Sequence, residues 1–372
     1  MKFLFACGGT AGHINPAIGV AGRLKQLIPD CEILFIGAEN MMETSLVPKE
    51  GYEIKTVKIS NLSRSLSLSG IKHNIATVKN VFASISQAKK IIREFSPDVV
   101  IGTGGYVCYP VLKAAHSLKI PTLVHESNAV PGLTTKMLAG IADCVMVGFE
   151  KAKDNYKPGT NVIYTGTPVR GEFFGYDKAK AKAELGIPAD KKLVVSVWGS
   201  LGSGHMNMIM ESFAPIAAEK GEFVLVHSAG KGYYPKLEKV LDERCPKRLE
   251  SGVDVRPYIY DMPRVMAAAD LIMCRSGAST IAELAAMGKP ALLVPSPNVT
   301  NNHQEKNARV LEELGGARVH VEGEFTPESL YEEICSMIND ADNLEAMGKA
   351  MSKAALSDSL DKICDIVLGY VK

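Results

Sequence analysis

The chain repeats one local scheme twice, and this repeat constrains the fold more than any other feature of the sequence. In the first half, the apolar run 3–6 enters the turn GGTAGH (8–13), and Asn15-Pro16 then opens a helix. In the second half, the apolar run 193–197 enters the turn GSLGSG (199–204), with a helix from about His205. Alternation of strands and helices is typical of α/β domains with parallel sheets. We therefore predict an α/β protein with two doubly wound domains.

The β-rich and helical runs locate the main elements of both domains. We expect strands near 2–7, 32–37, 98–102, 121–125 and 144–148, and then near 193–197, 222–228, 253–258, 270–274, 291–295 and 317–321. In the first half we expect helices near 16–28, 71–94, 110–118 and 132–141. The stretch 164–170 is interpreted as an interdomain linker. We assign 1–166 together with the final helix, 357–372, to one domain and 167–356 to the other.

Length, charge and cysteine pattern exclude several classes of protein. At 372 residues the chain is too long for one ordinary core, and its net charge of +1 provides no global field to recruit nucleic acid. The eight cysteines form no C-x-x-C pair and no cluster at metal-ligand spacing, which fits a reducing cytoplasm. No uncharged apolar run reaches the roughly 18 residues of a membrane span. We expect a soluble, cytoplasmic protein that needs no metal and no cofactor.

The first glycine-rich turn combines features of an anion site and of a proton acceptor. Backbone N–H groups and the positive end of a helix dipole can bind phosphate or diphosphate there. A tight turn that needs positive φ would also explain the glycines. It would not explain His13, and a titratable group beside an anion site is a candidate base. The spacing does not match the dinucleotide fingerprint G-x-G-x-x-G.

Two further polar loops follow predicted strands of the first half. The loop GTGGY (102–106) follows one strand, and HESN (125–128) ends the next. Adjacent parallel strands would place all three loops at one rim of the sheet. Histidines and glutamates at strand ends are in some proteins only hydrogen-bonded scaffolding, but three converging loops favour a binding site.

The second half contains its own polar segments after predicted strands. The segment RSGASTIAE (275–283) places Thr280 and Glu283 at capping-box spacing, so Glu283 either caps a helix or accepts the hydroxyls of a ribose. The polar cluster NHQEKN (302–307) has no evident role in a core. The one D-x-D, residues 340–342, is interpreted as helix capping. Backbone loops rather than carboxylates would therefore hold a diphosphate leaving group, without a metal.

Taken together, these segments resemble one family. The motifs GGTAGHINPA, GTGGYVCYP, HESNAVPGLTTKMLA, TGTPVR, CRSGASTIAELAAMGKPALLVP and NNHQEKNA occur in the order seen in the MurG family of peptidoglycan glycosyltransferases. The resemblance runs over about 1–320 and more weakly to the end. It implies a GT-B fold, two Rossmann-like domains with a cleft between them. It also implies inverting transfer of N-acetylglucosamine from UDP-N-acetylglucosamine to the muramoyl 4-hydroxyl of lipid I, at the cytoplasmic face of the cell membrane.

The resemblance also implies roles for individual residues. The second domain would bind the donor, with Arg170 and Ser200 facing the diphosphate and Glu283 the ribose. The full set of implied donor contacts is Thr10, Asn128, Arg170, Ser200, Ile259 (at the uracil), Ala278, Ser279, Thr280, Glu283, His303 and Gln304. The implied contacts of the acceptor diphosphate are Gly9, Thr10, Gly12, His13, Gly104, Gly105 and Tyr106. His13 is the first candidate for the catalytic base, and Glu126 is the second.

Several positions depart from the family pattern. Ala11 replaces a usual glycine, Ser127 a usual glutamine and Ser279 a usual leucine. The segment CY (108–109) replaces a usual Ser-Gly, and VWGSLGS (197–203) replaces G-G-S-x-G-A, which places the only tryptophan, Trp198, beside the donor loop. The donor-loop change bears on sugar choice and on loop motion.

Contact with a membrane and the choice of acceptor remain open from the sequence. Residues 71–82 place Ile71, Ile75, Val78 and Phe82 on one helical face near basic residues, which fits either a helix on anionic lipid or one packed on the sheet. Alternative functions are a UDP-sugar transferase with another lipid acceptor, such as diacylglycerol, and a UDP-N-acetylglucosamine epimerase. A non-catalytic UDP-sugar-binding subunit and a Rossmann dehydrogenase are two further alternatives.

Overall fold

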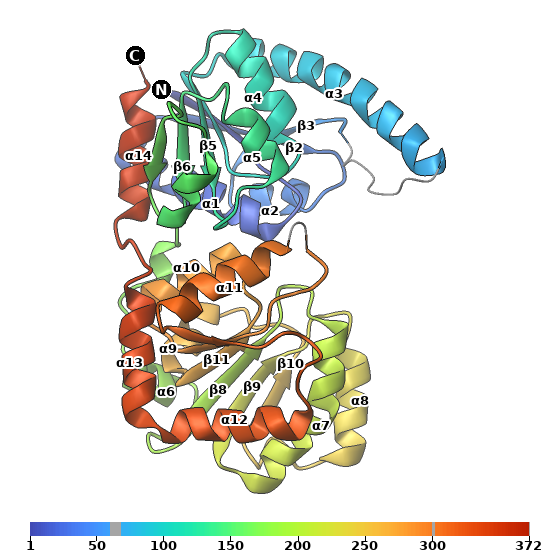
Figure 1. Ribbon diagram of the computed structural model, residues 1–372, viewed down its shortest axis with the longest axis vertical. Helices are drawn as coiled ribbons and strands as arrows, with labels where there is room; N and C mark the ends of the chain where they lie inside the picture. Colours follow the sequence, from blue (N-terminus) through green and yellow to red (C-terminus); the bar gives the residue numbers. More distant parts are fainter. Residues whose placement is uncertain (60–67, 300–301, 372) are drawn as a thin grey trace. The chain divides into compact units, whose positions relative to one another are not determined.

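The structure, a computed structural model, describes residues 1–59, 68–299 and 302–371, with the side chains of 68–79 outside the description. It divides into two compact units (Figure 1). Unit 1 comprises Met1–Val169 and Leu356–Lys372, and unit 2 comprises Arg170–Ala355. The chain therefore passes between the units after Val169 and after Ala355, within three residues of the boundaries expected from the sequence.

Unit 1 is built on a seven-stranded parallel sheet in the order β3-β2-β1-β4-β5-β6-β7. Its strands are β1 (Lys2–Ala6), β2 (Glu32–Ala38), β3 (Glu53–Val57), β4 (Val99–Gly102), β5 (Thr122–Glu126), β6 (Cys144–Val147) and β7 (Val162–Tyr164). Its helices are α1 (Ala11–Leu27), α2 (Glu43–Lys49), α3 (Leu68–Phe95), α4 (Cys108–Ser117), α5 (Leu133–Leu138) and α14 (Ser359–Gly369), with a short 3-10 helix, η1 (Glu150–Asn155). Strands β4 and β5 are buried throughout, as predicted for strands covered on both faces.

The last helix, α14, packs against α1 of unit 1, although the whole of unit 2 lies between them in the sequence (Figure 1). Ile363, Cys364 and Val367 of α14 are buried in the same hydrophobic core as Val20 and Leu24 of α1. The apolar face of α14 therefore contributes to the core of unit 1.

Unit 2 repeats the scheme with a six-stranded parallel sheet in the order β10-β9-β8-β11-β12-β13. Its strands are β8 (Lys192–Val197), β9 (Phe223–Ser228), β10 (Val253–Arg256), β11 (Leu271–Cys274), β12 (Ala291–Leu293) and β13 (Ala317–Val319). Its helices are η2 (Gly171–Phe173), α6 (Lys178–Glu184), α7 (Gly204–Lys220), α8 (Tyr234–Arg244), α9 (Met262–Ala268), α10 (Ala278–Met287), α11 (His303–Glu313), α12 (Pro327–Asn339) and α13 (Ala341–Ser352). The prediction of two α/β domains with parallel sheets is confirmed.

Two helix starts were predicted wrongly, for the same reason. Helix α1 begins at Ala11 with Thr10 as its N-cap, so Pro16 lies inside the helix rather than at its first turn. Helix α4 begins at Cys108, two residues before Pro110. Proline is favoured at the start of a helix but does not define it. As a consequence, His13 lies in the first turn of α1 and not in the preceding loop.

Three other expectations of local structure can now be judged. Strands β3 and β7 were not predicted, and β7 ends at Tyr164, inside the predicted linker. Helix α10 has Gly277 as its N-cap, so Thr280 cannot be the cap of a capping box with Glu283. The expected capping by the D-x-D segment is confirmed, since the Asp340 side chain accepts a hydrogen bond from the Asn343 N–H at 3.0 Å.

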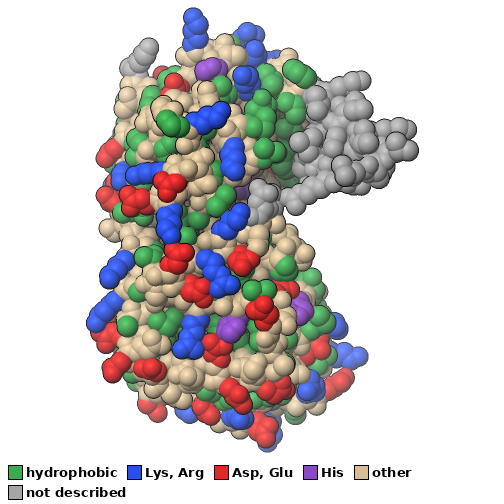
Figure 2. Space-filling view, viewed as in Figure 1, with side chains coloured by type: hydrophobic (Ala, Val, Ile, Leu, Met, Phe, Trp, Pro, Cys, Tyr) green, Lys and Arg blue, Asp and Glu red, His purple; other side chains and the backbone are tan. Residues whose placement is uncertain are grey.

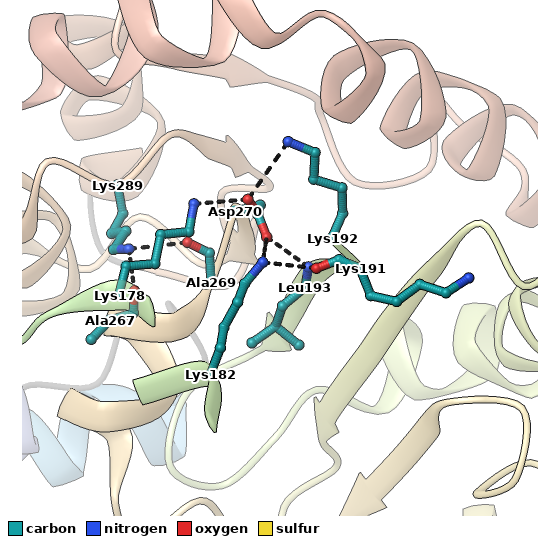
Figure 3. Close-up of polar contacts among 9 residues, drawn as sticks. All are labelled: Lys178, Lys182, Lys191, Lys192, Leu193, Ala267, Ala269, Asp270 and Lys289. Atoms are coloured by element: carbon teal, nitrogen blue, oxygen red, sulfur yellow. Dashed lines mark hydrogen bonds and ion pairs between the residues drawn. The ribbon is translucent and has the colours of Figure 1, made fainter. Parts of the chain in front are cut away.

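A buried carboxylate anchors α6 to the sheet of unit 2 (Figure 3). Asp270, at the start of β11, accepts hydrogen bonds from Lys178 Nζ at 2.7 Å and from the Leu193 N–H at 2.8 Å, and it forms an ion pair with Lys182 Nζ at 2.9 Å. Burial by itself would raise the pKa of Asp270, but these hydrogen bonds outweigh burial and hold the pKa below its usual value. The nearby Lys289 ammonium donates to two backbone carbonyls, and burial lowers its pKa to about 8.

The surface carries charges of both signs. Figure 2 shows lysine, arginine, aspartate and glutamate side chains interspersed on the visible face of each unit, in keeping with the net charge of +1. Among the described residues, no helix combines the length and the apolar character that crossing a membrane would require.

Candidate active site

The polar loops of unit 1 lie at one edge of its sheet. Strands β1, β4 and β5 are neighbours, and all strands of the sheet are parallel. Their carboxyl ends therefore meet at the same edge, where parallel α/β sheets bind ligands. This edge carries residues 8–13 after β1, 103–106 after β4 and 125–128 at the end of β5. The convergence expected from the sequence is observed.

The first two of these loops pack directly on each other. The Gly8 N–H donates to the Gly104 carbonyl at 3.3 Å, and the Thr103 hydroxyl donates to the His13 carbonyl at 2.7 Å. Gly104 has a φ of +119°, and a Cβ on it would lie 2.4 Å from Cδ2 of the His13 ring. The glycine at position 104 is thus required both by the backbone conformation and by the imidazole beside it.

His13 is oriented by its Nδ1 atom. Nδ1 lies 3.0 Å from the Gly8 carbonyl oxygen and 3.3 Å from the Thr10 hydroxyl. A carbonyl oxygen only accepts hydrogen bonds, so Nδ1 carries the proton and donates it to Gly8. In the neutral ring the lone pair is then on Nε2, the nitrogen that a general base needs.

Glu126, the second candidate for the base, uses both carboxylate oxygens within unit 1. Oε1 accepts from the Asn128 N–H at 3.1 Å and from its side-chain amide at 2.9 Å. Oε2 accepts from the Gly132 N–H at 3.0 Å and from the Thr135 hydroxyl at 2.7 Å. Glu126 is 5% exposed, so this carboxylate organises the loop 126–132 and the start of α5. In this arrangement it positions Asn128.

Two further residues of this edge have notable environments. The Tyr106 hydroxyl is buried without a hydrogen-bond partner among the described residues, and burial raises its pKa, with a smaller contribution from the Glu43 carboxylate. Glu43 itself was missed by the sequence analysis. It is fully buried at the start of α2, and its carboxylate accepts from the Gly9 N–H at 3.1 Å and from the Ala38 N–H at 2.9 Å.

In unit 2, the predicted donor contacts also follow the carboxyl ends of parallel strands. Ser200 follows β8, Ile259 follows β10, residues 278–283 follow β11, and residues 303–304 follow β12. Ser200 is exposed, Ala278, Ser279 and Thr280 form the first turn of α10, and Ile259 is only 3% exposed. Thr10 and Asn128, by contrast, belong to unit 1. The predicted donor residues are thus divided between the two units.

Glu283 lies on α10, in surroundings that raise the pKa of its carboxyl group. Burial raises its pKa from 4.5 to about 7, and the opposing effect of the Arg170 guanidinium is smaller. The Arg170 guanidinium is also paired with the Glu172 carboxylate at 2.6 Å, which weakens the effect of Arg170 on the pKa of Glu283. A carboxyl group with a pKa near neutrality is typical of functional sites.

Hydrogen bonds connect the start of α10 with the start of α11. The buried Ser276 hydroxyl donates to the Gln304 carbonyl at 2.8 Å, and the Asn307 side-chain amide donates to the Ser276 carbonyl at 3.2 Å. The Gln304 side-chain oxygen accepts from the Ser296 N–H at 2.9 Å. His303 and Gln304 are therefore held beside the segment 276–280.

Trp198, which precedes the donor loop in the sequence, has a buried side chain. Its ring is 2% exposed in the core of unit 2, and the Arg275 guanidinium lies 5.7 Å from the ring centre. Arg275 also donates to the Ser203 hydroxyl at 2.8 Å and is paired with Glu322. Arg275 therefore connects the buried tryptophan with Ser203 of the loop 199–203. Among the described residues, no three His, Cys, Asp or Glu side chains cluster as metal ligands.

Comparison with known proteins identifies the family. The model described as the glycosyltransferase family 28 N-terminal domain matches residues 3–147, and the model of the C-terminal domain of the same family matches residues 193–363. A relative from Acetivibrio thermocellus is 41% identical over 373 residues, covering 100% of this chain and 99% of its own length. That relative is named UDP-N-acetylglucosamine--N-acetylmuramyl-(pentapeptide) pyrophosphoryl-undecaprenol N-acetylglucosamine transferase.

Solved structures agree with this result. MurG of Acinetobacter baumannii matches with a TM-score of 0.76 and 26% identity over 99% of both chains, and the predicted GT-B fold is confirmed. The UDP-N-acetylglucosamine 2-epimerase of Neisseria meningitidis matches with a TM-score of 0.66 and 17% identity over 99% of this chain and 100% of its own, a likeness of fold alone. With both family models matched in order and a relative similar from end to end, the chain belongs to glycosyltransferase family 28.

Proposed function

We propose that this glycosyltransferase transfers N-acetylglucosamine from UDP-N-acetylglucosamine to the 4-hydroxyl of the muramoyl sugar of lipid I, giving lipid II for peptidoglycan synthesis. The observation that carries this assignment is the 41% identity, over its full length, to a transferase named for this donor and this acceptor. The epimerase alternative has only a likeness of fold at 17% identity in its support.

The transfer needs a base on the acceptor and stabilisation of the leaving group. His13 Nε2 takes the proton of the 4-hydroxyl while the hydroxyl oxygen forms a bond to the anomeric carbon. The bond from that carbon to the diphosphate oxygen breaks, UDP leaves with the electron pair, and the configuration inverts. The orientation of His13, with Nδ1 on the Gly8 carbonyl, supports this role. Glu126 positions Asn128 in this scheme, because its carboxylate already accepts four hydrogen bonds.

Unit 2 binds the donor in this proposal. Arg170 and Ser200 face the diphosphate, with the N-terminus of α10 at Ala278, Ser279 and Thr280, and backbone dipoles stabilise the charge that develops on UDP. Ile259 contacts the uracil, and Glu283 accepts the ribose hydroxyls. His303 and Gln304 contact the sugar, and Thr10 and Asn128 contribute from unit 1. No resident metal or cofactor is required by this set of residues.

Unit 1 binds the acceptor diphosphate through Gly9, Thr10, Gly12, His13, Gly104, Gly105 and Tyr106. The N–H groups of Gly8 and Gly9 are bonded to Gly104 and Glu43, so they are not the principal anion donors. Thr10 is the N-cap of α1 and Ala11 is its first residue, and the positive end of the helix dipole favours an anion at this turn. We therefore place the diphosphate at the first turn of α1.

A lipid-linked acceptor requires contact with the cytoplasmic face of the cell membrane, and we propose peripheral attachment there. The candidate segment, residues 71–82, belongs to α3, but most of its side chains lie outside the described residues. Phe82, the last of its four apolar positions, is 71% exposed. A basic amphipathic helix with exposed apolar residues can lie on anionic lipid.

The test is transfer of labelled N-acetylglucosamine from its UDP donor to a short-chain lipid I analogue, with and without EDTA. Equal product in both conditions is the expected result. Product only without EDTA would contradict the proposed metal independence. Release of UDP without lipid I, with conversion of the sugar, would instead indicate an epimerase. Transfer to diacylglycerol but not to the lipid I analogue would show that the proposed acceptor is wrong.

A further inference from the structure

We propose that Glu43 is a positioning residue for His13 and acts on it through the peptide group that joins Gly8 to Gly9. This inference rests on the proposed role of His13 as the base. Glu43 touches neither substrate, and its effect is transmitted by two hydrogen bonds on opposite sides of one peptide group.

The geometry follows from the planarity of the peptide. The Gly9 N–H and the Gly8 carbonyl belong to the same trans peptide group, so they point in opposite directions. On one side the N–H donates to Glu43 Oε2 at 3.1 Å. On the other side the carbonyl accepts from His13 Nδ1 at 3.0 Å. A carboxylate, a peptide dipole and an imidazole are therefore arranged in line.

Four glycines make room for this arrangement. A Cβ on Gly8 would lie 2.3 Å from Glu43 Oε1, and a Cβ on Gly37 would lie 2.4 Å from Glu43 Cγ. A Cβ on Gly105 would lie 2.3 Å from the Gly8 carbonyl oxygen, and Gly104 has the same relation to the His13 ring. These are contacts that no real Cβ makes, so the glycines around the turn accommodate the Glu43 side chain, the peptide group and the imidazole.

Few groups around Glu43 stabilise the negative charge of its carboxylate, and the Gly8–Gly9 peptide is one of them. The carboxylate is fully buried and forms no ion pair among the described residues. The titratable groups whose pKa values it raises are Cys7, Cys108 and Tyr106, and burial is the larger cause for all three. These groups are neutral at pH 7, so the two N–H groups of Gly9 and Ala38 are what stabilises the negative charge.

The consequence concerns the proton on His13. A carboxylate on the N–H side polarises the peptide and makes the Gly8 carbonyl a stronger acceptor. A stronger acceptor holds the proton on Nδ1, keeps the lone pair on Nε2 and stabilises the imidazolium formed when the base takes the acceptor proton. In the serine-protease triad, a carboxylate bonded directly to the base contributes about 10⁴ in kcat. Because a peptide group separates Glu43 from His13, we expect Glu43 to contribute less to kcat, about 10- to 100-fold.

The experiment compares Glu43→Gln with Glu50→Gln, which removes the same charge from an exposed site just after α2. For Glu43→Gln we expect kcat to fall about 10- to 100-fold, with the KM for UDP-N-acetylglucosamine changed less than about twofold. Glu50→Gln should match the wild type in both. Equal kcat in all three proteins would overturn the proposal.

A spectroscopic measurement separates positioning from mere support of the fold. Long-range ¹H–¹⁵N spectra report which ring nitrogen carries the proton, and His13→Gln assigns the His13 signals among eight histidines. Wild-type His13 should be the Nδ1–H tautomer, and Glu43→Gln should populate the Nε2–H tautomer. An unchanged tautomer in a folded Glu43→Gln protein would contradict the proposal.

A second pair of variants keeps the proposal testable if Glu43→Gln fails to fold. Gly8→Ala retains the carboxylate but displaces it, whereas Gly22→Ala in α1 meets only an ordinary contact at 3.7 Å. Gly8→Ala should reproduce the loss in kcat and Gly22→Ala should not. If His13→Ala kept full activity, the proposed base would be wrong. A slow His13→Ala with a fully active, folded Gly8→Ala would refute only the role of Glu43.

Discussion

Gly202 packs against the carbonyl of Ala229 so closely that a Cβ on Gly202 would lie 2.0 Å from the carbonyl oxygen. The oxygen cannot retreat easily, because it accepts a hydrogen bond from the Asn207 side-chain amide at 2.9 Å. The Asn207 side-chain oxygen is in turn hydrogen-bonded to Nε2 of the fully buried His227 at 3.0 Å. The loop that carries Ser200 therefore packs, through Gly202, against a network of buried hydrogen bonds.

Replacement of Gly202 by alanine should displace this loop. The φ of Gly202 is +77°, so Gly202→Ala adds backbone strain to the clash with Ala229. We expect the affinity for UDP-N-acetylglucosamine to fall at least about tenfold, and the free energy of unfolding to fall by about 2 kcal/mol. Calorimetric titration and urea unfolding measure the two effects. Gly221→Ala has a similar φ, +62°, in open space and should cost about 1 kcal/mol without a change in donor affinity.

Removal of the His13 imidazole should slow the chemical step without weakening donor binding. General-base catalysis typically contributes about 10²- to 10⁴-fold, so kcat of His13→Ala should fall by that factor. Affinity for UDP-N-acetylglucosamine should stay within about twofold, since His13 is proposed to act on the acceptor hydroxyl. The control is His116→Ala, which removes an exposed imidazole from α4. Steady-state kinetics in which His13→Ala and His116→Ala behave alike would contradict the assignment.

The affinity for the donor should depend on pH through Glu283. With a pKa of about 7, this carboxyl is mostly protonated at pH 6 and mostly ionised at pH 8. Only the ionised form can accept hydrogen bonds from both ribose hydroxyls with full strength, so affinity should rise about tenfold between these pH values. Titration with UDP-N-acetylglucosamine, whose own phosphates do not change charge in this range, measures the effect. Glu283→Gln should bind more weakly at pH 8 and show a flat profile.

Loss of the Asp270 carboxylate should destabilise unit 2. In Asp270→Asn, the buried Lys182 ammonium would keep its charge without its partner, and such losses cost about 3 kcal/mol or more. Urea unfolding measures the change. Glu345→Gln, which breaks the exposed ion pair with Lys349, should leave stability unchanged. A stable Asp270→Asn protein would show that the lysines find other partners.

The same aspartate predicts a loss of stability in acid. The folded-state pKa of Asp270 is lower than its unfolded value, so its ionisation stabilises the fold above the usual aspartate pKa of about 4. This contribution is lost as the pH falls through the lower, folded-state pKa. The wild type should therefore lose more stability than Asp270→Asn between about pH 5 and pH 2. Parallel slopes for the two proteins would contradict the expectation.

Strands and their order along the chain were predictable because burial on both faces leaves a continuous apolar run, as in β4 and β5. Strands β3 and β7 were not predicted. The sequence of β3 mixes polar and apolar residues, and β7 has only three residues, none of them fully buried. The starts of α1 and α4 were misplaced at Pro16 and Pro110, because proline is favoured in the first turn of a helix and was taken to mark the first residue. Short-range signals of this kind are weak compared with the packing of the turn that precedes the helix.

Within the candidate site, the sequence by itself determined that glycine-rich turns and polar residues follow successive parallel strands, since strand, turn and helix are encoded locally. It also singled out His13, because an imidazole has no place in a simple turn. Only the tertiary structure decided which glycines are needed for a positive φ and which make room for a side chain. Glu43 reaches Gly9 from 34 residues away, and nothing in the residues around it indicates that contact. Trp198 likewise appears beside the donor loop in the sequence, but its side chain is buried in the core of unit 2. Hydrogen bonds and packing between distant segments depend on where the completed sheet places them, and local sequence carries no record of those distances.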